Sequence, residues 1–235
     1  MDEFAREDGI RAPGFVDQTL AILAKDLTAE LRNRTALSSI LLFTVTSIVV
    51  VGFAVGPAGL EPSVKGALLW VVLFFAAFSG LSHVFIHEED AGTSQALRLT
   101  TSAGAVYAGK LLFNLILLAC IAAVVVPLFI VMLDFGPRNP LAFLAVVLVG
   151  CLALGAAATI VAAIIAKAGG KGALYGALGF PILIPMLVMA VDATPLAVTG
   201  RTMDGRLLND IVGLTSYSIL MITASALLFP SVWEE

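Results

Sequence analysis

Two histidines near the middle of the chain are the residues best suited to bind a metal. His83 and His87 are four positions apart, so on a helix their imidazoles share one face, one turn apart. Paired imidazoles of this kind can ligate a metal ion or a haem iron. The alternative is that both rings mark the end of a membrane helix, where imidazole is partly solvated. Both interpretations remain open from these residues alone.

The residues after His87 form a short polar interruption between two long apolar runs. An acidic trio at 88–90 closes the first run, and Gly92 then breaks the helix. Thr93 is placed to cap a new short amphipathic helix that ends near Leu99. Such a helix, held between two membrane spans, is well shaped to be bound by a protein outside the membrane. The candidate contact residues are Glu88, Glu89, Gly92, Thr93, Leu97, Arg98 and Leu99.

No catalytic site is recognisable in the sequence. The phosphate-binding pattern G-x-x-x-x-G-K-[ST] is absent, and the stretch nearest to it, at 166–173, lacks both the spacing and the hydroxyl. Ser82 beside His83 superficially resembles a serine-protease site. The only other histidine follows on the same helix, however, where it cannot act as a base from another span. We therefore predict a non-catalytic protein and assign no metal site apart from the open alternative at His83 and His87. Any ATP hydrolysis must come from a separate subunit.

The composition is that of an integral membrane protein. Hydrophobic residues make up 60% of the 235 residues, charged residues make up 13%, and the mean hydropathy is +1.03. Soluble domains average about 45–50% apolar and about 25% charged residues. No polar domain is left once the apolar runs are removed. We therefore expect contact with a lipid bilayer and none with nucleic acid.

We predict an all-α membrane protein in which an amphipathic helix precedes six transmembrane helices. Residues 1–14 form a polar tail, residues 15–34 form the amphipathic helix, and residues 35–235 form the transmembrane domain with its short helix near 93–99. The apolar stripe of the first helix consists of Val16, Leu20, Leu23, Leu27 and Leu31. This helix is too charged to cross a bilayer, so it lies along the membrane surface or packs on a partner in the cytosol.

Six apolar segments are each near the length of about 20 residues that crosses the hydrocarbon core. They are Leu37–Val55, Gly66–Ile86, Ala105–Leu133, Leu141–Ala166, Ala173–Val191 and Ile211–Phe229. With the N-terminus inside, the inside loops hold nine basic residues and the outside loops four, which sum to the thirteen in the chain. The positive-inside rule therefore predicts that both termini are cytoplasmic. Residues 192–210 then form the longest outside loop.

Few polar or small residues inside the spans support a prediction. Asn114 is the polar side chain placed deepest, and we expect its amide to form a hydrogen bond with a neighbouring helix. Small residues between 150 and 168 predict a close helix–helix interface, within one subunit or in a dimer. They include Gly155, Ala158, Ala162 and Ala166. The spans lack the interior charges of an ion-coupled carrier, since each such charge costs roughly 2.5–3.5 kcal/mol at the bilayer centre.

Several stretches together resemble the permease subunit of an ATP-binding-cassette (ABC) transporter of the six-helix, second export type. They are KDLTAELRNRTALSSILLF at Lys25–Phe43, HEEDAGTSQALRL at His87–Leu99 and YAGK at Tyr107–Lys110. In that type an acidic E-E-x-x-G-T segment leads into a coupling helix, and Y-x-x-G-K opens the third span. Within that group, the second span, the fifth span and the ending SVWEE resemble cytochrome c maturation protein B (CcmB), the haem-exporter permease family.

The resemblance implies a multi-subunit complex in the bacterial inner membrane. Its partners would be an ABC ATPase subunit, a second membrane subunit that handles haem, and a periplasmic haem chaperone. ATP hydrolysis in that family drives haem export or the release of the haem-loaded chaperone, and the coupling segment carries over to Glu88–Leu99. The tryptophan-rich haem-binding motif of the partner subunit is absent here, so we expect no directly bound cofactor. ATP and haem would be handled by the partners.

Three questions stay open in the sequence. The cargo of an export permease with this architecture could also be a lipid, a polysaccharide or a drug. A stand-alone channel or scaffold without an ATPase is a third hypothesis. Whether the small residues between 150 and 168 also form a homodimer contact stays open.

Overall fold

The chain folds into seven long helices in the part of it that the structure describes. The computed structural model describes residues 14–32, 35–55, 59–90, 97, 99–167, 173–200 and 202–234, without the side chains at 35, 36, 80–90, 166, 167, 173–178, 180 and 234. The helices are α1 (Phe15–Arg32), α2 (Thr35–Val55), α3 (Pro62–Asp90), α5 (Ala103–Leu133), α6 (Pro140–Lys167), α7 (Ala173–Thr199) and α8 (Gly205–Glu234).

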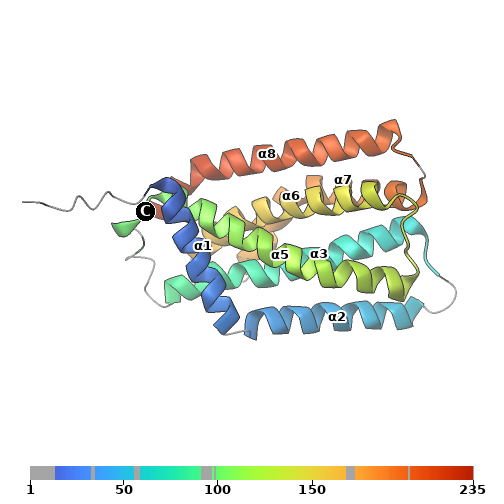
Figure 1. The fold of residues 1–235 in the computed structure, drawn as a ribbon, viewed down its shortest axis with the longest axis horizontal. Helices are drawn as coiled ribbons and strands as arrows, with labels where there is room; N and C mark the ends of the chain where they lie inside the picture. The colour runs from blue at the N-terminus through green and yellow to red at the C-terminus, as the bar shows by residue number, and fades with distance from the viewer. Residues whose placement is uncertain are drawn as a thin grey trace, which may run out of the picture.

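Six of these helices, α2 to α8, are long and apolar enough to cross a membrane. They run side by side along the long axis of the molecule, whereas α1 lies across one end of the bundle (Figure 1). We call this end the α1 end. The predicted all-α fold, with six membrane-spanning helices after an amphipathic first helix, is therefore confirmed.

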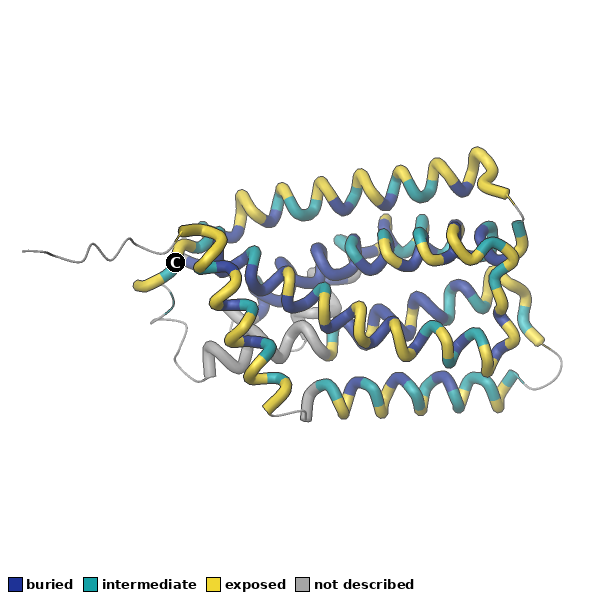
Figure 2. Tube along the Cα trace, in the orientation of Figure 1, coloured by how far each residue is buried: buried dark blue, intermediate teal, exposed yellow. Residues whose placement is uncertain are grey.

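The helix α6 lies at the centre of the bundle, where it contacts α3, α5, α7 and α8. Buried residues concentrate on α6 and its neighbours α3, α5 and α7, whereas exposed residues line the outer sides of α2 and α8 (Figure 2). Ala158 and Ala162 of α6 are each 1% exposed, so the predicted small-residue interface packs within one chain. The amide of Asn114 donates to Thr159 Oγ1 of α6 at 2.9 Å, which confirms the predicted hydrogen bond between helices.

A tryptophan holds α3, α6 and α7 together near the opposite end of the bundle. The indole Nε1 of Trp70 donates to Thr194 Oγ1 at 2.8 Å, and both side chains are fully buried. Gly150 of α6 faces the same indole, and a Cβ atom there would lie 2.1 Å from Trp70 Cη2. The ring is therefore fixed on one edge by a hydrogen bond and on the other by the α6 backbone.

Replacing Thr194 with valine is expected to lower the free energy of unfolding by about 1–3 kcal/mol, because the indole N–H is left buried without its acceptor. Valine has nearly the shape of threonine, so packing changes little. The thermal unfolding midpoint of the purified protein in detergent measures the effect. Thr199→Val is the matched control. The hydroxyls of Thr194 and Thr199 each donate to the carbonyl four residues earlier, but Thr199 is exposed. Equal shifts for the two variants would contradict the role given to the Trp70 hydrogen bond.

The prediction of a long outside loop at 192–210 is wrong. The helix α7 continues to Thr199 and α8 begins at Gly205, so the connection is short. Ala193 and Ala197 are fully buried in the core, and this packing keeps the chain helical through Pro195. Local turn residues suggested a loop, but burial of the alanine face decides the conformation.

Candidate docking surface at the α1 end

The end of α3 carries the histidine and acidic candidates. His83, His87, Glu88 and Glu89 fall in the last turns of α3, which ends at Asp90. Their side chains lie outside the described part of the chain, so the metal or haem interpretation of the two imidazoles stays a prediction. Among the described residues there is no group of three or more His, Cys, Asp or Glu side chains that could hold a metal ion.

The predicted coupling helix is only partly described. Gly92, Thr93 and Arg98 lie outside the described residues, whereas Leu97 and Leu99 have helical backbone. Leu97 is half-buried against an apolar cluster at the α1 end, and Leu99 is 88% exposed. The two leucines predicted to contact a partner therefore differ, because Leu97 packs on the bundle whereas Leu99 faces outward.

The helix α1 packs mainly on the first half of α5. The side of α1 that faces α5 carries Thr19, Ile22 and Asp26, each less than 9% exposed. Gly109 of α5 permits the close approach, because a Cβ atom there would lie 2.8 Å from Ile22 Cβ and 3.0 Å from the Thr19 carbonyl oxygen. The glycine of the YAGK stretch is thus the point where the two helices cross.

A buried ion pair lies next to this crossing. Lys110 Nζ is 3.2 Å from Asp26 Oδ2, and the side chains are 0% and 7% exposed. The other carboxylate oxygen of Asp26 lies 3.3 Å from Nζ of Lys25, which is 43% exposed. A buried charge of this kind is stable only when it is paired. Asp26 therefore connects a buried lysine on α5 to an exposed lysine on its own helix.

Aromatic rings join the start of α5 to the end of α8. The rings of Tyr107 and Phe229 have centroids 5.4 Å apart, and Phe229 stacks on Trp233 with centroids 5.5 Å apart. Tyr107 belongs to the YAGK stretch and Trp233 to the SVWEE ending. Two of the short stretches singled out in the sequence therefore meet at the α1 end.

The predicted apolar stripe of α1 is not the side that packs on α5. Val16, Leu20 and Leu31 are 65%, 53% and 63% exposed. Leu23 and Leu27 are only partly buried. An exposed apolar stripe on a helix that lies across the end of a membrane bundle is suited to the boundary between lipid headgroups and acyl chains.

Sequence reasoning missed the contact between Asp26 and Lys110. Both residues lie in stretches that carry the family resemblance, but nothing in the sequence pairs them. The available signal was the spacing of Thr19, Ile22 and Asp26, three and then four positions apart, which places them on one helix face. Nothing in the sequence states that this face meets a residue 84 positions away.

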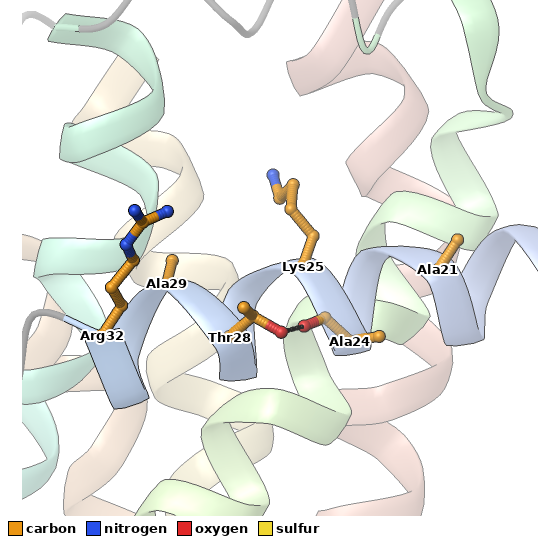
Figure 3. Close-up of a pocket in the computed structure, with 6 residues that line it drawn as sticks. All are labelled: Ala21, Ala24, Lys25, Thr28, Ala29 and Arg32. Carbon is orange, nitrogen blue, oxygen red and sulfur yellow. Dashed lines mark hydrogen bonds between the residues drawn. The ribbon is translucent and has the colours of Figure 1, made fainter.

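A third side of α1 forms a shallow hollow with a volume of about 570 Å³. Its lining residues are mostly small, with two basic side chains at its edge: Ala21, Ala24, Lys25, Thr28, Ala29 and Arg32. Lys25 and Arg32 point to the same side of the helix, and the Thr28 hydroxyl donates to the Ala24 carbonyl at 2.6 Å (Figure 3). Small side chains with flanking cations suit the close approach of an acidic protein surface.

A family model described as CcmB protein matches residues 17–227 of the chain. The matched range begins in α1 and ends in α8, so it includes the α1–α5 crossing and reaches into every membrane-spanning helix. A comparison with curated proteins finds no match to the chain.

Proposed function

We propose that this chain, which belongs to the CcmB family, couples ATP hydrolysis by a separate ATPase subunit to haem export or to release of a haem-loaded periplasmic chaperone. The family makes it a haem-exporter ABC permease component in cytochrome c maturation and a multi-pass membrane protein. The coupling, its partners and its direction are our proposal. The observation that carries it is the gathering of an exposed leucine and a basic hollow at one end of the bundle.

The ATPase docks at the α1 end. Leu99 offers an outward apolar side chain, and the hollow on α1 offers Lys25 and Arg32 to acidic groups of the ATPase. Leu97 holds the segment to the bundle. The acidic residues at the end of α3 and Arg98 supply further polar contacts. The docking surface therefore consists of the coupling segment together with the exposed side of α1.

The α1 end lies on the cytoplasmic side of a bacterial inner membrane. The helix α1 and the last turn of α8 lie at this end (Figure 1). Three of the basic residues predicted inside, Lys25, Arg32 and Lys110, lie in α1 or against it, as the positive-inside rule favours. ATP binds the partner ATPase and haem is handled by the second membrane subunit, so this chain needs no cofactor of its own.

Leu99→Asp is expected to abolish co-purification of the ATPase subunit while leaving the membrane protein folded. The side chain is already 88% exposed, so a carboxylate there costs the fold little but disrupts an apolar contact with the partner. Affinity purification of the tagged chain from membranes containing both subunits measures the bound ATPase.

Met203→Asp is the matched control, because Met203 is also exposed, at 51%, and lies in the connection between α7 and α8 at the opposite end. It should retain the ATPase fully. Leu97→Asp is expected to weaken folding as well as binding, since Leu97 packs on the bundle. Full retention of the ATPase by Leu99→Asp would rule out this docking surface.

A further inference from the structure

The helices α1 and α5 contact each other at several levels along their crossing. Ser102, just before α5, donates its backbone N–H and its hydroxyl to Gln18 Oε1, both at 3.1 Å. Farther along, the backbone of Gly109 meets α1 with no room for a side chain. Next to it, Lys110 Nζ lies 3.2 Å from Asp26 Oδ2. Contacts at three levels resist rotation of one helix on the other as well as separation.

Burial makes the ion pair unfavourable to separate. Lys110 is fully buried, and two opposite charges attract far more strongly in a protein interior than in water. Separating them would leave the fully buried Lys110 charge without the carboxylate that faces it, which is unfavourable. The pair is therefore expected to stay formed while surrounding exposed contacts exchange.

The helix α1 is attached more loosely to α2, its neighbour in sequence. The two helices contact each other far less than α1 and α5 do. The Leu37 backbone N–H donates to Glu30 Oε1 at 2.9 Å, in a part-buried position. A displacement of α1 should therefore be passed to α5 in preference to α2.

We propose that α1 and α5 move as one rigid unit, with Asp26 and Lys110 as the positioning pair that transmits displacement of α1 to the third span. The inference rests on the proposed function, because the displacement comes from the docked ATPase. Force then reaches α5 by two routes, through the coupling segment that precedes it and through α1. The second route does not pass through α3.

Distances between spin labels test whether the two helices move together. Labels are placed on exposed residues of a variant without native cysteines (Cys120→Ser, Cys151→Ala): Leu31 on α1 with Val131 on α5, and Leu31 with Phe53 on α2. In lipid nanodiscs, the ATPase subunit with a non-hydrolysable ATP analogue should shift the Leu31–Phe53 distance. The Leu31–Val131 distance should stay unchanged. A shift of both distances would overturn the proposal, and this comparison needs no substitution at the ion pair.

Variants of the pair test its positioning role on the chain alone. Asp26→Ala/Lys110→Ala should broaden the Leu31–Val131 distance distribution, and the exchanged pair Asp26→Lys/Lys110→Asp should restore a narrow one. An unchanged distribution in the alanine variant would show that the pair does not position α1. These measurements contain no ATPase. A chain that keeps a narrow distribution but binds no ATPase would therefore refute the docking proposal and leave the rigid unit standing.

Discussion

Gly150→Ala is expected to destabilise the protein by about 3 kcal/mol or more, at or beyond the upper end of the range for an overpacked core. The added Cβ atom would lie 2.1 Å from Trp70 Cη2 and 2.7 Å from Cζ2. The indole cannot move away easily, because it is fully buried and its Nε1 is bonded to Thr194. The backbones of α3 and α6 must therefore separate. Size-exclusion chromatography and thermal unfolding in detergent measure the loss.

Two further glycines calibrate this result. Gly136→Ala should leave stability nearly unchanged, since nothing lies within 4 Å of its added Cβ atom. Gly155→Ala should have an intermediate effect, because its close neighbour is the flexible end of Leu115 at 2.7 Å. Combining Gly150→Ala with Trp70→Phe should recover part of the lost stability. If Gly150→Ala behaved like Gly136→Ala, the close packing of α3 on α6 would be refuted.

Asp26→Leu is expected to destabilise the protein by about 3–5 kcal/mol, the usual range for breaking a buried ion pair by removing one partner. The substitution takes away the carboxylate that faces the fully buried Lys110 ammonium. Lys110→Met should cost less, because Asp26 keeps its contact with Lys25. Chemical or thermal unfolding in detergent, followed by tryptophan fluorescence, measures both variants.

The double variant Asp26→Leu/Lys110→Met supplies the control for this asymmetry. Replacing both charges with apolar side chains leaves neither charge buried alone, so the double variant should be more stable than Asp26→Leu. Additive losses in the double variant would mean that the two side chains do not interact. Asp17→Leu removes an exposed carboxylate of the same helix that accepts a hydrogen bond from the Gly14 N–H, so it should cost less than Asp26→Leu.

The membrane-spanning helices could be predicted because each one is encoded by a continuous apolar segment of the sequence. A run of about 20 apolar residues has few structures open to it in a bilayer. The boundary of α7 was missed because its last turns contain a proline and polar residues. What keeps them helical is the burial of Ala193 and Ala197 against other helices, and that contact is not local.

The proposed docking surface could be predicted only in part, for a related reason. The exposed Leu99 lies in a polar interruption between two long apolar runs, which is evident in the sequence. The hollow on α1 and the pair of Asp26 with Lys110 depend on how α1 crosses α5. Periodicity shows that a helix has distinct faces, but it does not show which face meets which neighbour. Glu88, Glu89, Gly92, Thr93 and Arg98 remain predictions for the docking segment.

The hydrogen bond from Asn114 to Thr159 constrains how the third and fourth spans can rearrange. Its donor and acceptor are 2.9 Å apart in a fully buried layer. A slide of one span along the other by one helical turn, about 5.4 Å, would break this bond. While the bond persists, the two spans can tilt relative to each other but cannot slide past each other along their axes by a full turn. We therefore expect an exporter with this bundle to open by a change in the tilt between the third and fourth spans, centred on the Asn114 amide.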